Sequence, residues 1–350
     1  MTSAAIFGCS GYRLSAQERA FFADANPWGF ILFRRNVESP DQVRALVQDL
    51  RDSVGRADTP ILIDQEGGRV QRLGPPFWPK YPPGAAYLQA TNGDVAKARE
   101  LVRLGARLMA NDLHALGINV DCVPVLDVPV PGAHDIIGDR AYARDPNTVA
   151  QLGRAAAEGM LAGGVLPIIK HIPGHGRAFA DSHHNLPVVE TPLAELDAWD
   201  FVPFRALSDM PMAMTAHVVF TAVDAEASAT TSVAGIRLMR EHLGFKGLIM
   251  CDDLSMQALS GTLTQRAEGA TAAGCDMMLH CNGDMAEMTQ VMAGTRTLEG
   301  LAAQRADAAL ARIVALPEPM DIEADTARFF AALDGRFQAA RGPDVGEAQA

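Results

Sequence analysis

The sequence has no surplus of positive charge and no long apolar run, and each absence excludes a class of partner. Against 42 aspartates and glutamates it has 30 lysines and arginines, which gives a formal net charge of -12 at pH 7. Because no basic run is present that could follow a phosphate backbone, nucleic acid is not an expected partner. No apolar run approaches the roughly 18 residues that a membrane-spanning helix needs, so no membrane partner is expected either.

Cysteine is also scarce, and its spacing shows no pairs. The cysteines are five in number: Cys9, Cys122, Cys251, Cys275 and Cys281. An odd set that lies mostly in or beside apolar runs is typical of reduced thiols in a cytosolic protein. The first residues contain no basic residue before Arg13, and no hydrophobic region of secretory length follows them. We therefore expect a cytoplasmic protein and favour a monomer, although the sequence leaves the oligomeric state open.

The composition that remains is typical of a globular enzyme with a large core. Of the 350 residues, 48% are hydrophobic and 21% are charged, which excludes disorder as the main state. Short apolar runs alternate with longer amphipathic segments, among them the predicted helices 39–54 and 93–116. The apolar runs predict strands at 4–7, 29–33, 60–63, 118–123, 165–169, 212–215, 247–251 and 275–279.

This alternation predicts an α/β fold with one catalytic domain. Strands that alternate with helices favour a parallel sheet, and about eight of them favour a single-domain (β/α)8 TIM barrel over residues 1–316. An open, doubly wound sheet is the alternative, but no GxGxxG motif follows the first strand. Residues 317–350 are predicted to form a last helix at 325–333 and then a mobile tail.

Polar side chains stand at or near the carboxyl ends of the predicted strands, where barrel enzymes build their active sites. These side chains are Arg34, Asp64, Asp121, Lys170, His217, Asp252 and His280. Their positions support the barrel independently of the strand count.

The greatest concentration of reactive side chains lies in the segment 170–187, KHIPGHGRAFADSHHNLP. It is too rich in glycine and proline to be helical, so we predict a polar loop that leaves the strand 165–169. Within it, Asp181 and His183 are spaced to project to the same side. A carboxylate beside an imidazole makes that imidazole a usable general acid and base, although a surface contact would give the same pattern.

Asp252 and Asp253 end another predicted strand. Successive side chains of an extended segment point to opposite faces, so only one of the two can easily reach the barrel axis. We choose Asp252, which could be a nucleophile, a general base, a metal ligand or a helix N-cap, and we expect Asp253 to be the cap.

Charged residues also surround glycine turns elsewhere in the chain. They are Asp64, Arg69 and Arg72 around Gly67 and Gly68, and Asp139 and Arg140 after Gly138. Ionised groups make strong hydrogen bonds to a hydroxyl-rich ligand, and ordinary surface ion pairs are the competing interpretation.

Three motifs in this order resemble one enzyme family. They are DQEGGRV at 64–70, KHIPGHG at 170–176 followed by Asp181, Ser182 and His183, and DDLSM at 252–256. Over roughly residues 5–315 the chain resembles the glycoside hydrolase family 3 β-N-acetylhexosaminidases. The resemblance is strongest to the short, cytoplasmic β-N-acetylglucosaminidases of bacterial cell-wall recycling.

This resemblance implies a retaining hydrolase that removes terminal N-acetylglucosamine from peptidoglycan fragments or related saccharides, without a metal or other cofactor. It implies Asp252 as the nucleophile and His183 as the general acid/base, assisted by Asp181. The residues that match the family's sugar-binding positions are Asp64, Arg72, Arg140, Lys170 and His171. The chain departs from the commoner family pattern at Ile172 and Arg34, and the change at Arg34 bears on the preference for the leaving group.

Other reactions fit parts of the same pattern. A substrate-assisted hexosaminidase would use two carboxylates, for which the opposed directions of Asp252 and Asp253 are unfavourable. A histidine acid/base also suits a phosphorylase, because it carries no negative charge to repel phosphate. A metal-dependent barrel hydrolase would use as ligands His171, His175, His183, His184 and Asp252. A non-catalytic sugar-binding barrel is the remaining alternative.

Overall fold

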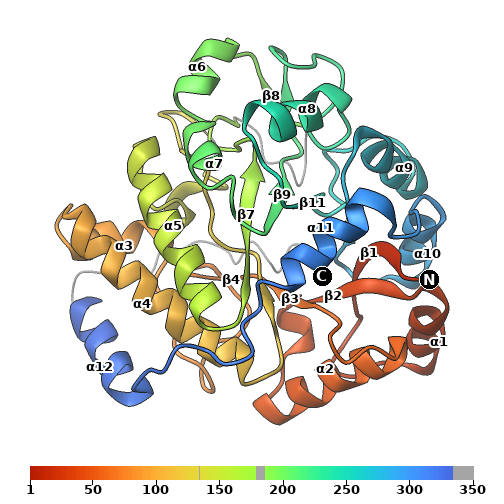
Figure 1. Cartoon of the computed structure of the whole chain (residues 1–350), viewed down its shortest axis with the longest axis horizontal. Helices are drawn as coiled ribbons and strands as arrows, with labels where there is room; N and C mark the ends of the chain where they lie inside the picture. The colour runs from red at the N-terminus through yellow and green to blue at the C-terminus, as the bar shows by residue number, and fades with distance from the viewer. Residues whose placement is uncertain (134, 179–185, 334–350) are drawn as a thin grey trace.

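Short, buried strands form the centre of the molecule (Figure 1). The computed structural model describes residues 1–133, 135–178 and 186–333. The strands of its main sheet are β1 (Ser3–Gly8), β2 (Pro27–Leu32), β3 (Ile61–Ile63), β6 (Val120–Asp121), β7 (Leu166–Ile172), β9 (Met212–Thr215), β11 (Leu248–Met250) and β12 (Met278–His280). Within the described ranges these eight strands are ordered β11-β9-β7-β6-β3-β2-β1-β12, with parallel neighbours.

The sheet closes on itself between its two outer strands. Met250 of β11 forms a parallel bridge to Met277, next to β12, and the N–H of Cys251 donates to the Met277 carbonyl at 3.0 Å. Sequential strands are neighbours around this closed sheet, as the strand-helix alternation predicts. The predicted (β/α)8 barrel is therefore confirmed.

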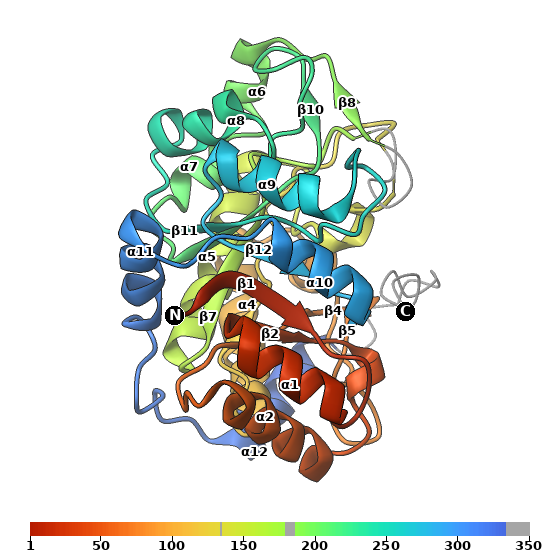
Figure 2. The same ribbon diagram turned by 90° about the vertical axis from the view of Figure 1, so that its right-hand side faces the viewer.

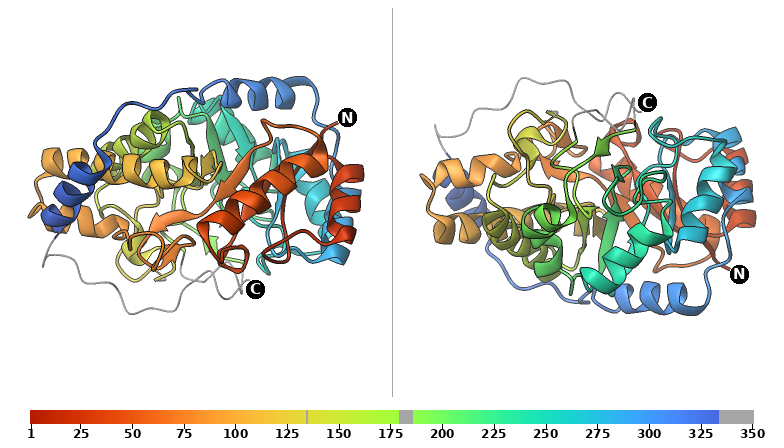
Figure 3. Two further views of the ribbon diagram at one scale, coloured as in Figure 1. Left: turned by 90° about the horizontal axis from the view of Figure 1, so that it is seen from below. Right: turned by 90° about the horizontal axis from the view of Figure 1, so that it is seen from above.

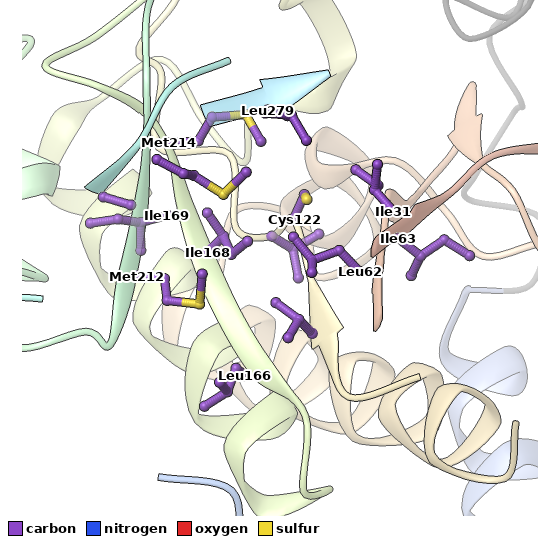
Figure 4. Close-up of a cluster of buried hydrophobic side chains, with 14 of the residues drawn as sticks. Ile31, Leu62, Ile63, Cys122, Leu166, Ile168, Ile169, Met212, Met214 and Leu279 are labelled. Carbon is purple, nitrogen blue, oxygen red and sulfur yellow. The ribbon is translucent and has the colours of Figure 1, made fainter. Parts of the chain in front are cut away.

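The strands are buried on both faces, which explains why they appear in the sequence as continuous apolar runs rather than as alternating patterns. Figure 4 shows part of this core, in which Leu62 of β3, Ile168 of β7 and Met212 of β9 lie close together. All three side chains are fully buried.

Helices surround the barrel (Figures 1 and 2). They are α1 (Ala16–Ala25), α2 (Pro40–Val54), α3 (Gly84–Ala90), α4 (Val95–His114), α5 (Pro146–Ala162), α6 (Leu193–Ala198), α7 (Val202–Ala206), α8 (Val233–Arg237), α9 (Leu263–Ala273), α10 (Met285–Ala293), α11 (Gly300–Leu310) and α12 (Ile322–Leu333). A π-helical turn, Leu238–His242, continues α8. None of the helices that the structure describes combines the length and apolar character needed to cross a bilayer.

The predicted helix 39–54 shows why the chain folds as the sequence indicates. The Ser39 hydroxyl accepts a hydrogen bond from the N–H of Gln42 at 3.3 Å, and Pro40 occupies the first turn of α2. Both positions suit these residues, because the cap satisfies a free N–H and proline has none to satisfy. Gly55 ends the helix with a φ of +66°, a left-handed conformation that glycine adopts without steric cost.

Two predicted strand boundaries are wrong by three residues, the largest differences among these strands. Lys170, His171 and Ile172 belong to β7 rather than to a loop, since Ile172 still pairs with Thr215 of β9. The side chains of Lys170 and His171 are buried against Asp64 and Asp127, respectively. The local sequence does not reveal these distant partners. The last strand begins at Met278 instead of 275, and before it the Asp276 carboxylate binds Arg240 and Arg305.

Helix α12 lies outside the ring of barrel helices and packs on α3 and α4 (Figures 1 and 3). It begins three residues before the predicted helix 325–333. The tail predicted to follow it, 334–350, lies outside the described residues.

Candidate active site

A pocket lies at the carboxyl ends of the barrel strands. Its lining includes Asp64, Glu66, Arg72, Arg140, Lys170, His171, His175, Asp252 and Asp253. The structure thus brings together all five residues that were predicted to bind sugar, and it places the predicted nucleophile in the same pocket. Of the predicted catalytic residues, Asp181 and His183 lie outside the described residues, as does His184.

The charged residues of this pocket form one continuous chain of ion pairs. Lys170 Nζ lies 2.9 Å from Asp64 Oδ1 and 2.6 Å from Glu66 Oε1. Arg72 Nη2 donates to Asp64 Oδ2 at 3.1 Å. At the other end, Arg140 binds Glu66 through both Nε, at 2.9 Å, and Nη2, at 2.8 Å. Each carboxylate therefore lies between two cations, and both acids stay ionised.

The pKa values of these groups reflect the alternation of acidic and basic side chains. Burial opposes ionisation of Asp64, but the charges of Lys170 and Arg72 outweigh it and hold the pKa of Asp64 well below its usual value. Burial opposes ionisation of Glu66 in the same way, and Arg140 and Lys170 lower its pKa to about 2. The two carboxylates in turn raise the pKa of Lys170. The chain of ion pairs is thus permanently charged across the physiological pH range.

Three chain segments supply this cluster. Asp64 follows β3, and a small antiparallel hairpin of β4 (Gln65–Gly67) and β5 (Val70–Gln71) returns the chain so that Arg72 meets Asp64. At the hairpin turn Gly67 has a φ of +93°, and a Cβ there would lie 2.3 Å from the Pro82 carbonyl oxygen. Only glycine fits this position. The short 3-10 helix η2 (Gly138–Arg140) supplies Arg140, and β7 supplies Lys170.

A second buried group orients His171. The Asp127 carboxylate lies 2.6 Å from His171 Nδ1, and its other oxygen accepts the backbone N–H of His175 at 2.6 Å. Because the carboxylate holds Nδ1, Nε2 is the ring nitrogen of His171 that can act on a ligand. Burial and the neighbouring His171 lower the pKa of His175 to about 4, so the His175 ring is neutral near pH 7.

The adjacent aspartates after β11 have different surroundings. Asp253 is buried, and its Oδ1 accepts the backbone N–H groups of Ser255, at 3.1 Å, and Cys281, at 3.2 Å. Its other oxygen accepts the Ser255 hydroxyl. Asp253 therefore caps a loop and not the helix N-terminus that was expected, since the next helix, α9, begins at Leu263 with Thr262 as its N-cap. Its N–H donates to Asp252 Oδ1 at 2.8 Å, which fixes one oxygen of the partly exposed Asp252 carboxylate.

Several other polar residues singled out in the sequence have structural roles. Arg69 donates to the Asp135 and Ile136 carbonyls, at 2.6 and 2.8 Å, and pairs with Asp139. His217 and His280 are buried, and they contact the Asp253 carbonyl and Glu287, respectively. Arg34 is exposed and donates to the Val37 carbonyl.

Three residues of the site were not assigned a sugar-site or catalytic role from the sequence: Glu66 and His175, which line the pocket, and Asp127, which contacts His171. Glu66 stands two residues after Asp64 in an extended segment, a spacing that puts both side chains on one face. That spacing was available as a signal. His175 was considered only as a metal ligand, and Asp127 gave no signal, because its contacts with His171 and His175 join segments that are distant in the chain.

The metal-dependent alternative requires several candidate ligands to lie close together. In the three described ranges, no group of three or more histidine, cysteine, aspartate or glutamate side chains is arranged to hold a metal ion. His171, one of the suggested ligands, uses Nδ1 to contact Asp127.

Beneath the charged cluster lies one more acid, Asp121 at the end of β6. It is fully buried, Oδ1 accepts the Gln65 N–H at 2.9 Å, and Oδ2 has no hydrogen-bond partner among the described residues. Burial raises the pKa of Asp121 to about 8. Its carboxyl group is thus mainly protonated at neutral pH, next to acids that are ionised.

Comparison with known proteins identifies a family domain over most of the chain. Residues 5–316 match the family model described as the glycosyl hydrolase family 3 N-terminal domain. A protein of Methylococcus capsulatus named beta-hexosaminidase is 42% identical over 281 residues, which cover 79% of this chain and 82% of the relative. A beta-hexosaminidase of Chromobacterium violaceum is 39% identical over 277 residues, covering 78% and 77%.

Solved structures show the same fold. NagZ from Neisseria gonorrhoeae, in complex with N-trifluoroacetyl-D-glucosamine, superimposes with a TM-score of 0.82 at 30% identity, covering 95% of this chain and 98% of that one. A glycoside hydrolase family 3 beta-N-acetylglucosaminidase from Paenibacillus superimposes with a TM-score of 0.76 at 32% identity, covering 97% and 63%. That family's barrel is the one observed in this chain.

The buried acid gives a testable dependence of stability on pH. Asp121 has a pKa of about 8 in the folded chain, against about 3.9 when unfolded. Its contribution is therefore fully present below about pH 4 and is lost as pH rises toward 8, by up to about 1.4 kcal/mol per unit. Asp121→Asn keeps the carbonyl acceptor and cannot ionise, so we expect its advantage over wild type to grow from pH 4 to pH 8.

The measurement is urea unfolding of both proteins at several pH values, with the exposed Asp58→Asn as the control. Effects of other titrating groups cancel in the difference. An advantage that is constant with pH would show that Asp121 is ionised in the folded protein.

Proposed function

The chain belongs to glycosyl hydrolase family 3 and is an enzyme of the β-hexosaminidase type, and we propose that it removes terminal N-acetylglucosamine from peptidoglycan fragments with retention of configuration. The observation that carries the proposal is the pocket itself. There the Asp252 carboxylate shares a cavity with a buried, permanently charged chain of acids and bases. Such a chain suits a neutral, hydroxyl-rich ligand, because ionised partners form the stronger hydrogen bonds.

In the first step of the proposed reaction, the Asp252 carboxylate attacks the anomeric carbon. The glycosidic C–O bond breaks at the same time, and the protonated imidazole of His183 gives its proton to the departing oxygen. The product of this step is a glycosyl ester on Asp252. The Asp253 N–H bond to Asp252 Oδ1 supports this assignment, because it holds the carboxylate in one orientation.

In the second step, His183 acts as a base. It removes a proton from water, which attacks the anomeric carbon from the face that the leaving group vacated and displaces Asp252. Asp181 would hold the His183 ring in the required tautomer. The assignments of His183 and Asp181 rest on the sequence motif alone, since both residues lie outside the described residues.

The sugar would be held by Asp64, Arg72, Arg140, Lys170 and His171. Lys170 and the two arginines already bind carboxylates, yet an ammonium has three donors and a guanidinium has five. Each cation can therefore bind a hydroxyl without leaving its ion pair. Binding energy from these non-reacting contacts can be used to distort the ring toward the transition state.

The choice of peptidoglycan fragments, and of a cytoplasmic site of action, rests on the family motifs and on the five buried, unpaired cysteines. If it is correct, release of N-acetylglucosamine from a disaccharide peptide with 1,6-anhydromuramic acid will exceed release from chitobiose, compared as kcat/KM. Equal or lower efficiency on the anhydromuramyl substrate would contradict this choice while leaving the hydrolase assignment intact.

The covalent step predicts a specific labelled residue. A 2-deoxy-2-fluoro glycoside with a good leaving group should inactivate the wild type and leave a stable adduct on Asp252, detected by mass spectrometry of the intact protein and its peptides. Asp252→Ala should lose activity by roughly 10³-fold or more and take up no label, because the proposed nucleophile is removed. The exposed Asp209→Ala is the control. An active, unlabelled enzyme would instead indicate substrate-assisted hydrolysis.

The acid role predicts a dependence on the leaving group. His183→Ala should lose roughly 10²- to 10⁴-fold in kcat/KM on a disaccharide, whose alkoxide leaves poorly without a proton. On 4-nitrophenyl β-N-acetylglucosaminide the loss should be far smaller, since nitrophenolate needs little protonation. His184→Ala is the adjacent control. Equal losses on both substrates would contradict the assignment of His183 as the acid.

A further inference from the structure

Helix α12 carries an aromatic side chain into the interior although it lies beyond the family domain, which ends at residue 316. Phe329 is fully buried. Its ring centre lies 6.1 Å from those of both Tyr81 and Tyr87, and the ring of its neighbour Phe330 lies 6.2 Å from that of Tyr81. These separations are within the range of favourable aromatic contacts.

Tyr81 connects this cluster of aromatic rings to the hairpin beside Asp64 and Arg72. Its carbonyl accepts the N–H of Gly68 at 2.9 Å, and its N–H donates to the side chain of Gln71 at 2.9 Å. Both partners belong to the segment that joins Asp64 to Arg72. The Tyr81 hydroxyl is also held, since it donates to Asp112 of α4 at 2.8 Å.

Tyr87 connects the same cluster of aromatic rings to Arg140. Its ring lies 6.3 Å from that of Tyr142, two residues after Arg140. At the start of the same helix, α3, Gly84 packs on the Arg140 backbone so closely that a Cβ would lie 2.3 Å from the Arg140 carbonyl oxygen. The two arginines at the ends of the ion-pair chain are therefore both connected to Phe329 through these contacts.

There is little room for this ring to move. Opposite it on α4 stands Gly105, where a Cβ would lie 2.7 Å from Phe329 Cε2 and 2.7 Å from the Tyr87 hydroxyl oxygen. Contacts under 3.0 Å require something to shift. A Cβ added at position 105 would therefore have to displace the Phe329 ring, the Tyr87 hydroxyl or both.

We propose that Phe329 is a positioning residue for sugar binding, acting through Tyr81 on Arg72 and through Tyr87 and Tyr142 on Arg140. The proposal rests on the proposed function, because the ligand it concerns is the terminal N-acetylglucosamine. It gives the segment after the family domain a part in substrate recognition, although none of the described residues of that segment, 317–333, lines the pocket.

The test compares ligand affinity with turnover in Phe329→Ala and Gly105→Ala. The first removes the ring and the second displaces it, so both should raise the inhibition constant of N-acetylglucosamine and the KM for 4-nitrophenyl β-N-acetylglucosaminide, roughly tenfold, with a smaller change in kcat. Phe329→Leu, which keeps apolar volume, should recover most of the affinity and serves if the alanine variant does not fold.

Phe22→Ala is the matched control, because Phe22 is an equally buried phenylalanine whose ring meets that of Phe30 edge to face, away from this cluster. It should lower the melting temperature and leave the inhibition constant unchanged. If Phe329→Ala and Gly105→Ala also lower only the melting temperature or the active fraction, Phe329 is merely structural and the proposal is overturned. A wild type that neither binds nor hydrolyses the N-acetylglucosamine compounds would instead overturn the proposed function.

Discussion

The rest of the pocket depends on the placement of Lys170 between Asp64 and Glu66. The Lys170 side chain is 3% exposed, so its ammonium group has given up most of its hydration and is stabilised by the two carboxylates instead. Removing one partner from such a buried pair commonly costs about 3–5 kcal/mol, because the remaining charge is left unpaired. Three separate segments, the β4–β5 hairpin, the end of β7 and η2, are therefore held together by electrostatic interactions that leave no ion without a counterion.

Features encoded by neighbouring residues could be predicted from the sequence, and features that depend on distant contacts could not. The barrel could be predicted because each strand is buried on both faces and so appears as a local apolar run, and Asp64, Lys170 and Asp252 could be placed by their positions at strand ends. Lys170 and His171 were wrongly put in a loop, because β7 still pairs with β9 there and the polar side chains are buried by contact with Asp64, 106 residues away, and with Asp127, 44 residues away. No window of neighbouring residues contains that information.

The pair Asp252 and Asp253 shows how much alternation alone can decide. Opposed side-chain directions in an extended segment separated the two aspartates, and the structure gives them different partners, with Asp253 bound to the backbone of its own loop and of the residue after β12. A carboxylate whose oxygens already accept three hydrogen bonds is poorly placed to orient an acetamido group. The geometry therefore favours a mechanism that uses Asp252 alone as the reacting carboxylate. It argues against the substrate-assisted mechanism, which needs two carboxylates, without appeal to the family resemblance.

A pocket built from permanently charged groups has a further physical requirement, which is rigidity. Charged donors bind a neutral sugar well only if they do not relax toward one another when the ligand leaves, and the energy of an ion pair changes steeply with distance at low dielectric. The ion-pair chain sets the distances between its own members but not their position relative to Asp252. We infer that this position is set by the scaffold behind them, where the ring of Phe329 lies 6.1 Å from those of Tyr81 and Tyr87 and against Gly105 of α4. Because closely packed aromatic side chains resist displacement more than a solvated loop does, a helix outside the catalytic domain can influence the affinity of a site that it does not touch.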